Sequence, residues 1–223
     1  MAATDWKPMA GSARSSRISY GVFNNAEPPP GYTGKVLGFN SLPAIDTGCI
    51  ALRADSEDFA PMASGGSILG CIRRGEFYDG VLGYTPFFFL GAQDRSIQAE
   101  AYILSLSDED YPRVLLRRGS IATLGEDGAL LDSTPPILTD GTPWRHLRLD
   151  VSLGIIGRSM LMAYTNDLDL PAYDVGHPNW KLIMACDEEA PLVGGYAGFG
   201  FHAEVPGRQS FFAHVEIFRQ VYP

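Results

Sequence analysis

The residues that could carry acid–base or metal chemistry are few and scattered. The four histidines are His146, His177, His202 and His214, and none has the short spacing to another histidine or to a cysteine that a zinc site requires. The sequence therefore predicts no metal site and no cofactor. His146 and His214 fall on outward positions of strand-like segments, so we interpret both as surface or rim residues.

Carboxylates gather in four short clusters: Asp55/Glu57/Asp58, Asp108-Glu109-Asp110, Asp167/Asp169 and Asp187-Glu188-Glu189. Such clusters can hold Ca²⁺ and equally suit solvated turns. A glycosidase needs two carboxylates facing one cleft, and the Glu-x-Asp-x-x-Glu run of β-sandwich glucanases is absent. No Gly-x-Ser-x-Gly elbow occurs either. The sequence thus predicts a protein that is not an enzyme and has no catalytic residue.

Arginines occur in close pairs, Arg73-Arg74, Arg117-Arg118 and Arg145 with Arg148. If their strands are neighbours, these residues form a basic stripe that could meet an acidic partner. The alternative is a solvated sheet face on which each arginine pairs with a nearby carboxylate.

Composition excludes several classes of function. The formal net charge of −9 disfavours binding to nucleic acid, because phosphate contact needs positive potential. No apolar run approaches the roughly 20 residues that span a bilayer, and the first residues lack the pattern of a signal peptide. Cys49, Cys71 and Cys186 are odd in number and lie in apolar runs, which favours buried free thiols and a reducing compartment.

The elements that would position any site are strands. In 144–153, Arg145, Leu147, Leu149, Val151 and Leu153 alternate with polar residues, which predicts a strand with one buried face. Residues 154–157 then predict a turn and 158–166 a returning strand, so this hairpin is the centre of the expected fold.

Further short strands follow at a cadence typical of a sandwich. We expect them at 35–39, 48–53, 67–74, 86–92, 99–105, 113–118, 120–124, 180–185, 196–203 and 211–219. Pro86–Leu90 is apolar on both faces and is therefore placed centrally. In the last strand, Phe211, Ala213, Val215 and Ile217 are expected to face inward.

Residues 1–35 are expected to form an extended N-terminal arm, followed by a sandwich domain over 36–223. Glu27-Pro-Pro-Pro-Gly31 excludes regular helix or central strand. Trp6, Tyr20 and Phe23 are its candidate anchors. The arm either straps its own domain or packs on a neighbouring subunit.

The C-terminal third resembles a concanavalin A-like, laminin-G-type jelly roll. The resemblance is carried by Trp144–Val151 with its hairpin, by Gly198-Phe-Gly-Phe201, and by Ser210–Phe218. It implies an all-β, antiparallel two-sheet jelly-roll sandwich. Ala213 stands where that family often has an aspartate, so an inherited calcium or sugar site is not implied.

The first third is similar to structural proteins of tailed bacteriophages, at Asp5-Trp-Lys-Pro8, Gly38–Leu42, Phe59–Ser67 and Ile72–Gly75. This resemblance implies a virion component, in the capsid as a decoration protein or in the tail or tail tip. It would be assembled in the host cytoplasm as a homo-oligomer that contacts other virion proteins.

The alternative is a carbohydrate-binding module for host surface glycan. Its candidate stacking residues are aromatic: Tyr78, Tyr84, Tyr173, Trp180 and Tyr196. Packing in the core or at the rim is the more common role for each of these side chains.

Overall fold

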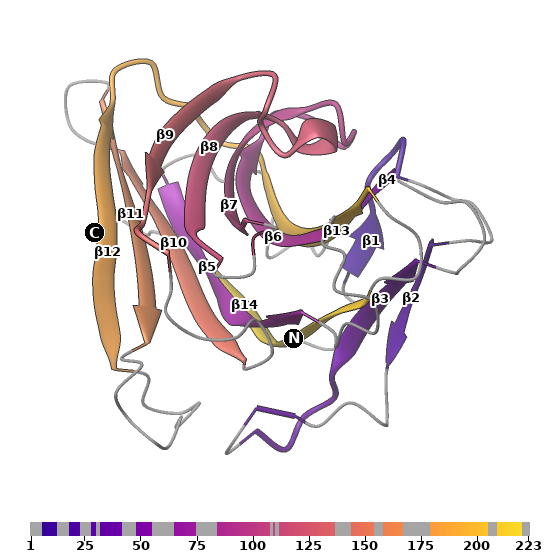
Figure 1. Cartoon of the computed structure of the whole chain (residues 1–223). Coiled ribbons are helices and arrows are strands. Elements are labelled where there is room, and N and C mark those ends of the chain that lie inside the picture. The colour runs from indigo at the N-terminus through magenta and orange to yellow at the C-terminus, as the bar shows by residue number, and fades with distance from the viewer. Residues whose placement is uncertain are drawn as a thin grey trace.

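The computed structural model describes residues 6–12, 18–22, 28–29, 32–41, 48–54, 65–74, 84–107, 109, 112–136, 144–153, 158–166, 179–204 and 209–219. These residues form two seven-stranded sheets packed face to face, and every strand pairing is antiparallel (Figure 1). The expected two-sheet, all-β sandwich is confirmed.

The two sheets are named here by position. The front sheet has the order β1 (Trp6–Pro8), β4 (Gly48–Ala54), β13 (Tyr196–Ala203), β6 (Tyr84–Ala92), β7 (Glu100–Leu106), β8 (Val114–Ser120) and β9 (Ala129–Ser133). The back sheet has the order β12 (Trp180–Glu188), β11 (Ser159–Asn166), β10 (Arg145–Leu153), β5 (Gly65–Arg74), β14 (Gln209–Arg219), β3 (Leu37–Ser41) and β2 (Ile18–Val22).

The predicted hairpin is present as β10 and β11, which pair from Leu153 with Ser159 to Leu147 with Thr165. On its other side β10 pairs with β5, so the hairpin lies within the back sheet. Leu147 and Leu149 are fully buried between the sheets, as their alternation requires.

Aromatic rings fill the space between the sheets. The ring centroids of Phe199 and Phe212 lie 4.8 Å apart, and those of Phe39 and Phe212 lie 5.4 Å apart at an edge-to-face angle of 83°. Each fully buried ring contributes about 1.5–3 kcal/mol through removal of apolar surface from water. These rings come from both sheets, so their packing joins the two layers.

Strand β6 is buried on both faces and lies fourth of seven in the front sheet, as predicted. Phe88 and Leu90 face the interior, whereas Phe87 and Phe89 face outward into a second apolar cluster. The neighbouring strand β13 accommodates the outward rings because Gly200 has no side chain. A Cβ there would overlap the Phe87 ring and the Ile50 carbonyl oxygen.

One predicted strand is wrong, because residues 121–123 form a 3₁₀ turn (Ile121–Thr123). The Ser120 side chain accepts a hydrogen bond from the Ala122 backbone N–H, and Leu124 adopts a left-handed conformation with φ of 55°. The turn is fixed to β4 by the Cys49 thiol, which donates to the Ile121 carbonyl over 3.6 Å. Burial raises the pKa of Cys49 to about 12.

No helix in the described ranges is long and apolar enough to cross a membrane.

In the last strand, the predicted inward side is confirmed for Val215 and Ile217 and is wrong for Phe211 and Ala213. The pairing of β14 with β5 shifts register between Ala213 and Glu216, and His214 there has a positive φ of 50°. This β-bulge reverses the alternation, so Phe212 faces the main core while Phe211 and Ala213 join a small cluster outside the back sheet. Strand β9 is not among the strands predicted from the sequence.

We expected His146 to be a surface or rim residue, and this prediction is wrong. It lies on the outer face of the back sheet, yet its exposure is only 1%. The Trp180 ring covers it, with ring centroids 4.4 Å apart. Burial, with a smaller contribution from His214, lowers the pKa of His146 to about 3.

The proposed boundary at residue 35 stays a prediction, but two strands within 1–35 are edge strands of the sheets. β1 pairs with β4 and β2 pairs with β3. Trp6 is buried and packs edge-to-face on Phe199 at 4.6 Å, so this candidate anchor contacts its own domain. The structure gives the backbone of Tyr20 but not its side chain, and Phe23 lies outside the described residues.

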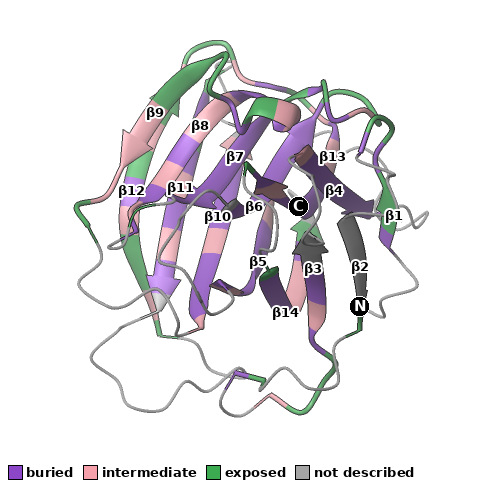
Figure 2. Cartoon of the chain, turned by 45° about the vertical axis from the view of Figure 1, so that its right-hand side comes forward, coloured by how far each residue is buried: buried purple, intermediate pink, exposed green. Residues whose placement is uncertain are grey.

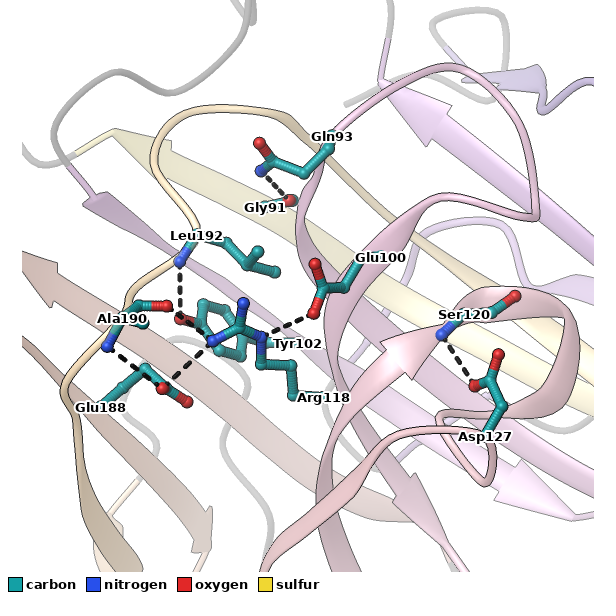
Figure 3. A network of polar contacts seen from close by, with 10 residues as sticks. All are labelled: Gly91, Gln93, Glu100, Tyr102, Arg118, Ser120, Asp127, Glu188, Ala190 and Leu192. Atoms are coloured by element: carbon teal, nitrogen blue, oxygen red, sulfur yellow. Dashed lines mark hydrogen bonds and ion pairs between the residues drawn. The ribbon is translucent and has the colours of Figure 1, made fainter.

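A polar network ties the end of β12 to the front sheet (Figure 3). The Arg118 guanidinium contacts Glu100 at 2.8 Å and Glu188 at 3.1 Å, and donates to the Ala190 carbonyl at 2.6 Å. The Leu192 backbone N–H donates to the Tyr102 hydroxyl at 2.9 Å. Because its polar atoms are mutually satisfied, we assign this network a structural role.

Replacing Gly200 by alanine is expected to destabilise the fold by about 1–3 kcal/mol, because the added methyl forces Phe87 or the β4 backbone to move. Urea unfolding monitored by circular dichroism measures this. Ala129→Ser, which adds one atom at an exposed site of β9, is the matched control. Equal midpoints for the two variants would contradict the close packing of β13.

The buried His146 predicts a loss of stability in mild acid. Its folded pKa of about 3 lies below the ordinary 6.5, so the unfolded chain binds one more proton between those values. The contribution of His146 to the free energy of unfolding is fully present above pH 6.5. Below that pH it falls by up to about 1.4 kcal/mol per pH unit. Urea unfolding measures the free energy of unfolding at pH 7, pH 6 and pH 5. This free energy should decrease less on acidification for His146→Gln than for the unaltered chain. Identical decreases would show that His146 is not held neutral.

Candidate functional site

A cavity of about 320 Å³ opens on the outer face of the front sheet. The front sheet is concave on this side, because strands β6 to β9 curve, and the 3₁₀ turn lies at one end of these strands (Figure 1). The cavity is lined by Thr85, Ser105, Leu106, Ser107, Glu109, Arg113, Leu115, Arg117, Leu124, Glu126, Leu130, Ser133, His202 and Glu204. We call this the front cavity.

Strand register builds the floor of the front cavity from residues distant in sequence. Ser105 of β7 lies between Phe87 of β6 and Leu115 of β8. His202 of β13 lies opposite Thr85 of β6. Because side chains alternate along each strand, these five point to the same outer face. Thr85, Ser105, Leu115 and His202 line the front cavity, whereas Phe87 on the same face is fully buried.

Two arginines reach the front cavity, Arg117 from β8 and Arg113 from the residue before β8, and each pairs with a glutamate from a loop. Arg117 Nη1 lies 3.4 Å from Glu126 Oε1, and Arg113 Nε lies 3.2 Å from Glu109 Oε2. The two glutamate side chains are 62% and 52% exposed, so water weakens both ion pairs. Each pair thus presents hydrogen-bond donors and acceptors side by side to a solvent-filled space.

His202 supplies a neutral imidazole to the same face. Burial lowers its pKa, and the carboxylates of Glu204 and Glu126 only partly oppose that shift. At neutral pH one ring nitrogen therefore donates and the other accepts.

Ser105 adds a hydroxyl that is buried and has no hydrogen-bond partner among the described residues. A buried polar group without a partner costs free energy, and a ligand hydroxyl recovers that cost only if the Ser105 side chain turns to expose its oxygen. The front cavity thus contains a polar position that protein atoms leave unsatisfied.

The chemistry available in the front cavity is polar recognition. Three carboxylates line it, and two of them are paired with arginine. Within the described part of the chain, no group of three His, Cys, Asp or Glu residues is arranged to hold a metal ion. The donors and acceptors are suited to binding a ligand rich in hydroxyl groups.

The predicted stacking aromatics lie elsewhere. Tyr78 and Tyr173 fall outside the described residues, and only the backbone of Tyr84 is described, at the start of β6. Trp180 covers His146 on the back sheet, whereas Tyr196 lies on the front sheet. The structure therefore does not bring Trp180 and Tyr196 together, and neither lines the front cavity.

The Tyr196 ring is already occupied by protein groups. The guanidinium carbons of Arg53 and Arg95 lie 5.1 and 5.5 Å from its centroid. Arg95 Nε also donates to the Tyr196 hydroxyl over 2.8 Å. Tyr196 also lines an open cavity of about 500 Å³ beside Arg95, so a sugar stacked on this ring would compete with the arginine contacts.

The arginine pairs do not form one stripe. Arg117 and Arg118 belong to the front sheet, whereas Arg73, Arg145 and Arg148 belong to the back sheet. Arg148 makes two hydrogen bonds of 2.7 Å to Asp150.

The three cysteines are free; Cys49 and Cys71 are buried as predicted, and Cys186 is half-buried.

The front cavity was not predicted from the sequence, although Arg117 was singled out as part of a basic stripe and Glu109 as part of a carboxylate cluster. The only local signals are Ser105-x-Ser107 and Arg113-x-Leu115-x-Arg117, which place polar side chains on one face of adjacent strands. These signals become informative only once the register between strands is known.

No protein-family model matches the sequence, and no curated protein matches it. Solved structures do match in fold. The carbohydrate-binding module CBM66 from Bacillus subtilis is 10% identical, with a TM-score of 0.54 over 96% of this chain and 95% of that chain. The potassium-bound carbohydrate recognition domain of Emp46p is 10% identical, with a TM-score of 0.60 over 98% and 90%.

A lectin from Bauhinia forficata in complex with GalNAc is 9% identical, with a TM-score of 0.50 over 96% of each chain. A native glycosidic hydrolase is 10% identical, with a TM-score of 0.53 over 100% of this chain and 94% of that chain. At such identities the similarity concerns the fold alone. The chain therefore has the concanavalin A-like jelly-roll fold that its C-terminal third resembles in sequence.

Proposed function

We propose that this protein is a carbohydrate-binding module that holds glycan in the front cavity without cleaving it. The observation that carries the proposal is the row of donors and acceptors on the hollow outer face of the front sheet. The fold is compatible with this role, because similar structures include a carbohydrate-binding module, a carbohydrate recognition domain and a lectin.

The paired arginines and glutamates fit sugar hydroxyls in particular. A hydroxyl group donates one hydrogen bond and accepts others, so it can donate to Glu126 while accepting from Arg117. Charge-assisted hydrogen bonds of this kind are stronger than neutral ones. His202 and Ser105 extend the same pattern across the floor.

Apolar contact would come from leucines, because no aromatic residue is among the described residues that line the front cavity. Leu130 is 57% exposed at the rim, and Leu115 forms part of the floor. A volume of about 320 Å³ is at the small end of the ~300–1,000 Å³ typical of ligand pockets. The proposed ligand is therefore a short glycan segment recognised mainly through hydrogen bonds.

The proposed site predicts that Arg117→Gln weakens glycan binding by about tenfold or more, because a charge-assisted hydrogen bond of about 1.5–3 kcal/mol is lost. A glycan array identifies the ligand, and calorimetry then measures its Kd. Arg158→Gln is the control, because Arg158 pairs with Glu189 at 3.1 Å, on a more exposed side chain and away from the front cavity. A uniformly negative array, or equal losses in both variants, would contradict the proposal.

The absence of catalysis is tested on the same glycan. We expect no release of reducing ends when the protein is incubated with its bound ligand. Turnover abolished by Glu126→Gln would instead make the front cavity a hydrolytic active site, since Glu126 would then act as an acid or base.

The virion role, the location in a particle and the virion partners stay predictions drawn from the first third of the sequence. Detection of the chain in purified phage particles would test them. A glycan-binding domain on a particle surface would be compatible with both predictions.

A further inference from the structure

The charged groups that line the front cavity do not balance. The lining has three carboxylates and two guanidinium groups, from Glu109, Glu126, Glu204, Arg113 and Arg117. His202 adds no charge at neutral pH, because burial lowers the pKa of its imidazole. The front cavity therefore carries one negative charge in excess, on a chain whose formal net charge is −9.

Glu204 accounts for the excess charge. Glu109 and Glu126 each pair with an arginine, whereas Glu204 forms no ion pair with any residue that the structure describes. Its side chain is exposed, directly after the end of β13. The carboxylates of Glu204 and Glu126 both oppose the lowering of the His202 pKa, so both act on this imidazole from nearby. A cation bound beside His202 would therefore be attracted by two carboxylates.

The groups around His202 are mainly hydrogen-bond acceptors. The two carboxylates only accept, and the neutral imidazole has one accepting nitrogen. The hydroxyl of Thr85, which lies opposite His202 in the sheet, can accept as well. An ammonium group carries three N–H donors and no acceptor, so it uses this set of acceptors more fully than a hydroxyl group does.

A buried hydroxyl in the same part of the cavity also lacks a partner. Strands β6 and β7 are buried along almost all their length, whereas β8 and β9 are partly exposed (Figure 2). Ser105 of β7 is 1% exposed, lines the front cavity and has no hydrogen-bond partner among the described residues. It pairs in register with Phe87, two residues along β6 from Thr85. Once its side chain turns toward the cavity, its oxygen adds a further acceptor on the enclosed side.

We propose that the front cavity prefers glycans with free amino groups, such as glucosamine units, over neutral and acidic glycans. This inference rests on the proposed glycan-binding function and specifies the class of sugar. The ammonium group lies between Glu204 and Glu126 and neutralises the excess charge, with His202 and Thr85 as further acceptors. A sugar that bears carboxylate or sulfate would instead add negative charge to a cavity that already has an excess.

The test compares two tetrasaccharides that differ in charge. Calorimetry on the full chain at pH 6 measures the Kd of β-1,4-linked glucosamine tetrasaccharide and of its fully N-acetylated form. The charged form should bind about fivefold or more tightly, and this advantage should decrease at high salt, because salt screens charge but does not change the size of the acetyl group. Glu204→Gln should lower the ratio of the two Kd values by about threefold.

The matched control is Glu216→Gln. Glu216 follows His214 by two residues, as Glu204 follows His202, but it belongs to the back sheet, with Oε1 3.5 Å from His214 Nε2. This variant should leave the ratio of Kd values unchanged, and circular dichroism confirms that both variants fold.

The outcomes separate this inference from the proposed function. Equal affinities for the two tetrasaccharides, or equal effects of the two variants, would overturn the preference for amines and leave glycan binding in place. If neither tetrasaccharide binds, the preference is also overturned. Binding of another sugar on the glycan array would then still support the proposed function, and a uniformly negative array would contradict both.

Discussion

The structure depends on the packing of aromatic rings between two antiparallel sheets. Phe39 and Phe212 come from the back sheet and Phe199 from the front sheet, and their rings meet in one cluster. Because this interior is the main apolar cluster, part of the outer face of the front sheet can carry polar residues without loss of the core. The front cavity occupies that part, with His202 and Arg117 on strands whose opposite faces are buried.

Much of the fold could be predicted from local pattern, because alternation reports directly which face of a strand is buried. It identified the β10–β11 hairpin and the two-sided burial of Phe87 and Phe88. It failed where backbone geometry breaks the alternation. The 3₁₀ turn at Ile121–Thr123 depends on a cap, and the bulge at His214 reverses the faces of β14. The cap is a local contact between Ser120 and Ala122, whereas the bulge is defined by the pairing of β14 with β5, which the alternation of a single strand does not reveal.

The candidate site could not be predicted because its residues share a surface only through long-range register. Ser105, Leu115 and His202 are far apart in sequence and adjacent in the sheet. The search for exposed aromatics pointed elsewhere, since a sequence does not reveal that Trp180 covers His146 or that two arginines lie over Tyr196. The choice of exposed aromatic residues located the candidate site less well than the curvature and register of the front sheet.

The hydrogen bond between the Cys49 thiol and the Ile121 carbonyl makes the reactivity of Cys49 a measure of local opening at the 3₁₀ turn. The thiol is buried, and its raised pKa leaves almost none of it as the reactive thiolate. Alkylation therefore requires the turn at Ile121 to separate from β4. Since that turn precedes Leu124 and Glu126 in the cavity wall, the rate of labelling at Cys49 measures how often the wall opens.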